Sequence, residues 1–216
     1  MFAWVIALGL LWNADTPALR TAIPSATLLV YLQTGPAQPA APVEHMKREL
    51  GALMQASGYH VIWGDARAPG SSAESASLVV LELRGGCGMP PGNYRGERYV
   101  ASGASLAETS MDAGSVQPFS WIDCANLTRM IGPALAGEPG ALRDYLYGRA
   151  MARVAAHELY HVVMGNSGHG HEGVTKPRFT VPDLLDEDFT FDAAARSKLR
   201  QRALENSGAG ETVVGR

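Results

Sequence analysis

The chain has 216 residues and a formal net charge of −3, because 18 Lys and Arg residues face 21 Asp and Glu residues. This length corresponds to one domain with a short tail, and the mildly acidic balance excludes a strongly basic nucleic-acid-binding protein. Hydrophobic residues make up 46% of the chain, which excludes a wholly disordered protein.

Residues 2–12 form an unbroken apolar run, FAWVIALGLLW. A run of this length is too short to span a bilayer, which takes about 20 residues, but it matches the apolar core of a secretory leader. We therefore expect residues 1–22 to be a leader that is removed. The mature protein would then be exported, periplasmic or extracellular, with no remaining membrane span. The alternative is a buried N-terminal strand or helix in a cytoplasmic protein.

Cys87 and Cys124 are the two cysteines of the chain. Neither belongs to a C-x-x-C pair, which argues against metal binding by cysteine. A bond between them would close a loop of about 37 residues and stabilise the fold by about 3–4 kcal/mol on the chain-entropy model. Because an apolar leader and a single pair of cysteines agree with each other, we expect one disulfide. Two free buried thiols are the alternative.

Hydrophobic patterns predict the regular elements of the first part of the chain. Short runs rich in β-branched and aromatic residues predict strands at 26–32, 59–63 and 77–83. Apolar residues at helical spacing predict a helix at 43–57, and a loop rich in proline and alanine precedes it at 35–42.

In the second part of the chain, weak alternation predicts an edge strand at 99–107 with a partner strand at 116–122. Apolar residues at helical spacing then predict helices at 125–135, from 141 to about 164, and at 192–204.

The order strand, helix, strand, strand predicts a right-handed crossover into a mixed sheet. The expected fold class is therefore α/β, or α+β, with a small helical part at the C-terminus. The chain has no internal repeat. We expect a single catalytic domain over residues 23–205 and a flexible polar tail over residues 206–216.

The most specific feature is His157-Glu158-Leu159-Tyr160-His161, an H-E-x-x-H motif on the long predicted helix. Four residues advance a helix by about 400°, so the two histidines lie about 40° apart on one face and about 6 Å apart along the axis. Both imidazoles can therefore bind one metal ion. Glu158 lies beside that face, where a carboxylate can act on a metal-bound water as a general base without binding the metal.

A catalytic zinc site needs a third protein ligand and an open position for water. Gly165 or Gly168 can end the helix and turn the chain back, which brings His169 within reach of the ion. We expect His169 to be the third ligand, with His171 as the alternative. Weaker candidates are Glu172, Asp186 and Glu187.

The run HELYHVVMGNSGHGHEGVTKP resembles the metzincin-type zincins, whose pattern is H-E-x-x-H-x-x-G-x-x-H. It is also similar to exported bacterial proteins with an H-E-L-Y-H core. The resemblance implies a zincin-like peptidase with a mixed, mostly parallel sheet, an antiparallel edge strand that holds substrate, and a long active-site helix. It makes His157, His161 and His169 zinc ligands and Glu158 the base. The chain differs from the metzincin pattern in two ways: His169 lies two residues farther along, and no methionine follows Met164.

These residues predict a zinc-dependent metallopeptidase that hydrolyses a peptide or protein substrate, with Glu158 passing a proton from water to the leaving amine. The residue that stabilises the oxyanion is left open among Tyr145, Tyr147, Lys176 and Arg178. One alternative is a non-catalytic binding module that zinc stabilises on the same scaffold. Another is a protein without metal, in which the motif histidines are ordinary polar groups.

Overall fold

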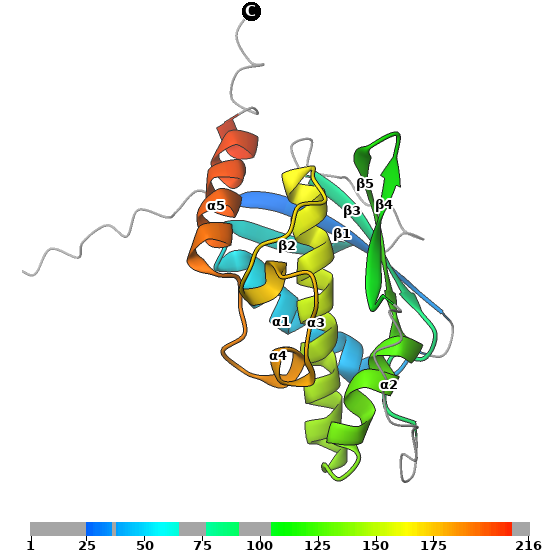
Figure 1. Ribbon diagram of the computed structural model, residues 1–216. Helices are drawn as coiled ribbons and strands as arrows, with labels where there is room; N and C mark the ends of the chain where they lie inside the picture. The colour runs from blue at the N-terminus through cyan, green and yellow to red at the C-terminus, as the bar shows by residue number, and fades with distance from the viewer. Residues whose placement is uncertain (1–24, 36–37, 65–76, 91–104, 209–216) are drawn as a thin grey trace, which may run out of the picture.

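The computed structural model describes residues 25–35, 38–64, 77–90 and 105–208. The predicted leader, residues 1–22, lies outside these ranges, and so does most of the predicted tail. In the described part, a β-sheet is packed against the long helix α3 (Gly140–Met164) and the helix α1 (Ala40–Gln55) (Figure 1).

Within the described ranges, the sheet has five strands. β1 (Ala26–Thr34) pairs in parallel with β2 (Tyr59–Gly64) on one side and β3 (Ser77–Arg84) on the other. β5 (Ser115–Asp123) pairs in parallel with β3, and β4 (Ala107–Asp112) pairs antiparallel with β5. The strand order is therefore β2-β1-β3-β5-β4, with the antiparallel strand at the edge. This confirms the expected fold class of a mixed, mostly parallel α/β sheet.

The edge strand itself lies later in the chain than predicted. The edge strand was predicted at 99–107. Residues 105–106 are not in a strand, so the prediction was wrong there, and residues 99–104 lie outside the described ranges. A two-residue turn follows β4, and its residues Ala113 and Gly114 have φ angles of 46° and 83°. Two positive φ angles are what a tight hairpin requires, but Asn-Gly or Asp-Gly is the usual sequence for them. Because Ala-Gly is not a usual sequence for this turn, the turn was not recognised, and neither was the position of the strand before it.

The helices lie close to their predicted positions. α1 begins three residues early, inside the predicted loop, because Pro42 lies in the first turn, where its missing N–H costs no hydrogen bond. α5 (Ala193–Gly208) continues past residue 204 into the predicted flexible tail, so residues 206–208 are helical. Among the described residues, no helix is long and apolar enough to cross a membrane. The predicted helices are α1 (Ala40–Gln55), α2 (Cys124–Leu135), α3 (Gly140–Met164) and α5 (Ala193–Gly208), and two short helices were not predicted, η1 (Gly173–Thr175) and α4 (Val181–Leu185).

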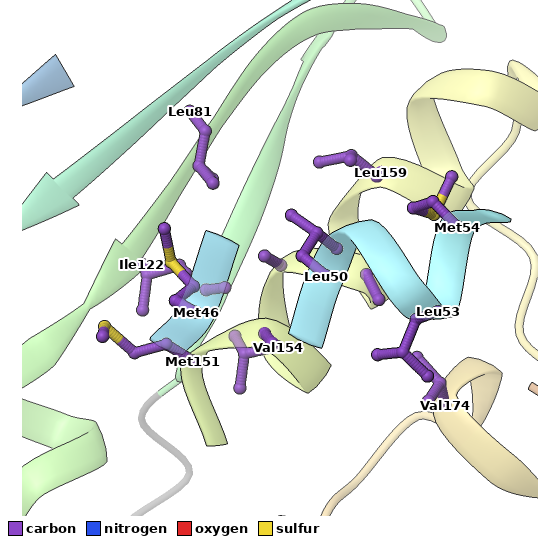
Figure 2. Packing of buried hydrophobic residues seen from close by; sticks show 14 of the residues in the cluster. Met46, Leu50, Leu53, Met54, Leu81, Ile122, Met151, Val154, Leu159 and Val174 are labelled. Carbon is purple, nitrogen blue, oxygen red and sulfur yellow. The ribbon is translucent and has the colours of Figure 1, made fainter. Parts of the chain in front are cut away.

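α1 and α3 approach each other closely at Gly148. A Cβ atom at this position would lie 2.6 Å from the carbonyl oxygen of Pro42 and 2.9 Å from the amide nitrogen of Met46, so no larger residue fits without moving α1. Figure 2 shows the buried side chains between these helices and the sheet. They include Met46 and Leu50 of α1, Leu81 and Ile122 of the sheet, and Met151, Val154 and Leu159 of α3.

A disulfide joins Cys87, which follows β3, to Cys124, the first residue of α2. Both cysteines are fully buried, and the backbone N–H of Cys87 donates a hydrogen bond to Oε1 of Gln38 at 2.9 Å. The predicted pairing is confirmed. The bond fixes the segment after β3 to the start of α2.

Candidate metal centre

The motif lies in the C-terminal half of α3, in a stretch from 147 to 161 in which every residue is buried. Small residues such as Ala152 and Ala156 keep this half of the helix narrow enough to pack against its neighbours. The helix ends at Gly165, whose φ of 63° is the left-handed conformation that glycine adopts without strain. The chain therefore turns back sharply, and the following segment lies against the motif.

His157 and His161 point toward one another, with 3.0 Å between their Nε2 atoms. Nδ1 of His157 lies 2.7 Å from the carbonyl oxygen of Val174, and Nδ1 of His161 lies 2.9 Å from that of Asn166. A carbonyl oxygen can only accept, so each Nδ1 carries the proton and each Nε2 presents a lone pair. Histidines that bind metals are typically oriented in this way by a partner on the other ring nitrogen.

His169 completes a group of three. Its ring centroid lies 5.2 Å from that of His157 and 4.9 Å from that of His161. One nitrogen from each ring can be chosen so that all three lie within 4.8 Å of one another, a spacing that can hold a metal ion. Among the described residues this is the only group of its kind. The alternative ligands that the sequence left open are not part of it: His171, Glu172, Asp186 and Glu187.

The environment keeps the two motif histidines neutral. Burial is the main cause that lowers the pKa of His157 to about 4, and the neighbouring His161 and His169 lower it further. Burial likewise lowers the pKa of His161, with His169 adding to the effect. Neutral imidazoles are the form that binds metal ions. Two facing lone pairs repel each other, and a cation between them removes that repulsion.

Glu158 is buried between α3 and the sheet, with 6% of its surface exposed. The hydroxyl of Thr109, on the edge strand β4, donates a hydrogen bond of 2.6 Å to its Oε2. The hydroxyl of Ser120, on β5, lies 2.9 Å from that of Thr109. Burial raises the pKa of Glu158 to about 7, a shift that the Thr109 hydrogen bond reduces and the nearby Glu108 increases.

Thr109 and Ser120 were missed by the sequence analysis. They are paired across β4 and β5, and both point toward α3, so the only local sign of their role is a polar residue at an inward-facing strand position. That sign could be used only after the register of the two strands was known.

The segment after α3 orients His157. The N–H of Val174 donates to the carbonyl of Thr190 at 3.1 Å, while its own carbonyl accepts from His157. Arg153, one turn before the motif, donates from Nε to the carbonyl of Phe189 at 3.1 Å. The ring of Phe179 contacts His157 edge-on, with 5.4 Å between centroids.

Three of the four residues that the sequence left open as oxyanion stabilisers have other partners in the structure. Tyr145 donates to Oε1 of Glu49 at 3.2 Å, and Tyr147 donates to the carbonyl of Cys124 at 3.1 Å. Lys176 forms an ion pair of 2.6 Å with Asp183. The fourth, Arg178, is exposed. The structure therefore does not bring Tyr145, Tyr147 or Lys176 to the histidine group as a free donor.

We compared the chain with known proteins. No family model matches the sequence, and no curated protein matches it. A functional assignment therefore depends on the geometry of this centre.

Proposed function

We propose that this protein is a zinc-dependent metallopeptidase of the zincin type, in which His157, His161 and His169 bind the metal and Glu158 is the general base. One observation carries the proposal. Two buried imidazoles present their Nε2 lone pairs to each other at 3.0 Å, with a third imidazole beside them, on a helix whose Glu158 contacts the antiparallel edge strand.

The donor set fits zinc. Tetrahedral zinc with bonds of about 2.0–2.1 Å separates its nitrogen ligands by about 3.3 Å, close to the separation of the two Nε2 atoms. Three imidazoles leave a fourth coordination position for water, which a catalytic site requires. Both cysteines are held in the disulfide, so they do not compete as ligands.

When bound, zinc supplies a water of lowered pKa and polarises the scissile carbonyl. Glu158 accepts the proton of the attacking water and passes it to the leaving amine. The Thr109 hydroxyl holds the carboxyl of Glu158 in one orientation for both transfers. The carbonyls of Val174 and Asn166 hold the two motif imidazoles with Nε2 toward the reaction centre.

The edge strand supports a peptide as the substrate. β4 pairs with β5 on one side, and no described strand pairs with its other side. A free strand edge can bind an extended peptide through backbone hydrogen bonds, as an added strand. Because Thr109 on β4 contacts Glu158, a peptide on this edge would pass beside the base.

We also propose that the protein is exported. The support is the disulfide, which is typical of oxidising compartments, together with the apolar run at residues 2–12. Expression of the full chain in a bacterium, followed by fractionation and mass spectrometry, tests this. We expect a shortened protein outside the cytoplasm, and a full-length cytoplasmic protein would contradict export.

Glu158→Gln tests the catalytic role. The zinc-loaded wild type and variant are each incubated with a broad peptide library, and cleavage is read by mass spectrometry. We expect the variant to keep one zinc per chain and to lose at least about 100-fold in cleavage rate, because a general base contributes that much or more. Glu172→Gln, outside the histidine group, is the matched control and should keep both properties.

The other outcomes separate the rival functions. Stoichiometric zinc without cleavage by the wild type would favour a non-catalytic module that zinc stabilises. Failure of the wild type to bind zinc on reconstitution would contradict both zinc proposals.

A further inference from the structure

Two arginines of α3 are buried before the motif. Arg149 and Arg153 are 5% and 1% exposed, and they lie four residues apart, on one face of the helix. Arg153 donates to the backbone carbonyls of Phe189, Asp186 and Glu187. Carbonyl groups satisfy its N–H donors, but they do not neutralise its charge.

One carboxylate serves both guanidinium groups. Oε2 of Glu49, on α1, lies 3.6 Å from Nε of Arg149 and 4.0 Å from Nη1 of Arg153. Both distances exceed the roughly 2.7–2.9 Å of a charge-assisted hydrogen bond. Burial lowers the pKa of Arg153 to about 10, and the neighbouring charge of Arg149 lowers it further. Glu49 and Asp186 raise this pKa, but Asp186 is exposed to water, so the two buried guanidinium groups face one partly buried carboxylate.

Arg149 has an unused donor. Its side chain is 94% buried, since 6% of it is exposed, and no hydrogen-bond acceptor among the described residues reaches its Nε. A buried charged donor without an acceptor costs free energy. An acceptor from outside the protein would remove this cost.

A cavity of about 280 Å³ opens beside these residues, between α1, α3, the segment before α5 and α5 itself. Arg149, Arg153 and Glu49 line it together with Arg196, and Phe191 and Ala52 add apolar surface. Its lining includes three arginines against two glutamates, and the second of these, Glu187, is exposed to water, which screens its charge.

We propose that this cavity binds a small oxyanion, a phosphate or carboxylate group, through Nε of Arg149 and the positive charge of Arg153 beside it. Nη1 and Nη2 of Arg149 already donate to the carbonyl of Leu185 and the hydroxyl of Tyr145, so Nε is the donor left for a ligand. A hydrogen bond from a charged donor to an anionic oxygen is short and strong. The oxyanion accepts from the unused Nε of Arg149 and adds a negative charge next to the two buried guanidinium groups. This site shares no residue with the histidine group.

Zinc-loaded protein, free of excess zinc, is titrated with sodium phosphate or sodium acetate at constant ionic strength made up with sodium chloride. Calorimetry measures the dissociation constant, and thermal unfolding measures the melting temperature. We expect saturable binding and a melting temperature that rises with anion concentration, because the anion binds only the folded state. Tighter binding of phosphate would assign a phosphoryl group as the ligand, and tighter binding of acetate would assign a carboxylate.

Two variants test whether the anion binds beside Arg149 and Glu49. Arg149→Met keeps most of the side-chain volume and should weaken binding by about tenfold or more, the loss of one charge-assisted hydrogen bond. Glu49→Gln removes the competing carboxylate and should tighten binding by at least about threefold. If Arg149→Met does not fold, Glu49→Gln alone tests the position of the anion. Arg202→Gln, at an exposed pair on α5, is the control and should change nothing.

The proposal would be overturned if neither anion binds saturably. Equal binding by Arg149→Met and the wild type would also overturn it, because the anion would then lie elsewhere, for example on the metal. Unchanged binding in Glu49→Gln counts against it as well.

Discussion

Thr109 on β4 donates a hydrogen bond of 2.6 Å to Glu158 on α3, 49 residues away in the sequence. Ser120 on β5 lies against the same hydroxyl, at 2.9 Å. A buried carboxyl is stable only when its oxygens have such partners. Here the partner comes from the strand on which we propose that the substrate binds, so one contact joins the base to the substrate edge.

Thr109→Val removes this hydroxyl at nearly constant volume. We expect kcat to fall by about 10-fold to 100-fold, because a general base that is poorly oriented loses that much. Zinc content should stay at one per chain, because Thr109 is not part of the histidine group. Peptide cleavage and metal analysis of the purified variant check both. Thr109→Ser keeps the hydroxyl and should retain most of the activity, and equal loss in both variants would contradict a role for the hydrogen bond.

His169→Ala tests the third ligand. Loss of one of three ligands should weaken zinc binding by more than about 100-fold. Loss of a group that only hydrogen-bonds to a ligand already lowers metal affinity by about 10-fold to 100-fold. Competition with a chromogenic chelator measures the affinity. His171→Ala is the matched control, two residues away and outside the group, and should bind zinc as the wild type does. The reverse result would make His171 the ligand.

Gly148→Ala tests the close contact of α1 and α3. The added Cβ would lie 2.6 Å from the carbonyl oxygen of Pro42, a backbone atom that cannot rotate away. We expect the free energy of unfolding to fall by about 1–3 kcal/mol or more. Urea denaturation measures the loss. Gly51→Ala on α1 is the control: apart from its chain neighbours and the backbone of α1 itself, no atom lies within 4 Å of the added Cβ, so the change should stabilise the helix by about 0.4–1 kcal/mol.

Replacing Cys87 and Cys124 together by serine tests the disulfide. The bond closes a separation of 37 residues, and its removal should lower the free energy of unfolding by about 3–4 kcal/mol. Reduction of the wild type should give a similar loss. Urea denaturation with and without reductant makes the comparison. If reductant leaves the wild type unchanged while the double variant is destabilised, the effect would come from packing of the serines rather than from the bond.

The positions of the two motif histidines could be predicted because they depend on one element alone. A helix places residues four apart on one face whatever surrounds it, so the proximity of His157 and His161 follows from their spacing. His169 was harder, since its position depends on how the chain turns after Gly165. A helix-ending glycine was a sufficient clue to the turn.

The partners of the site could not be predicted in the same way. Thr109 contacts Glu158 only because β4 and β5 pair in one register, and that register depends on the turn at Ala113 and Gly114. Arg153 was equally hidden. Its acceptors are backbone carbonyls, which every residue has, so no side-chain pattern in the sequence marks them.

The carbonyl of Val174 that orients His157 comes from a part of the chain made after the motif. Val174 is in turn held by Thr190, close to the start of α5. During synthesis, the H-E-x-x-H sequence therefore leaves the ribosome before the groups that aim its imidazoles exist. Strong metal capture is expected only once the chain has folded through about residue 190, so a chain interrupted earlier would carry the motif without a working centre.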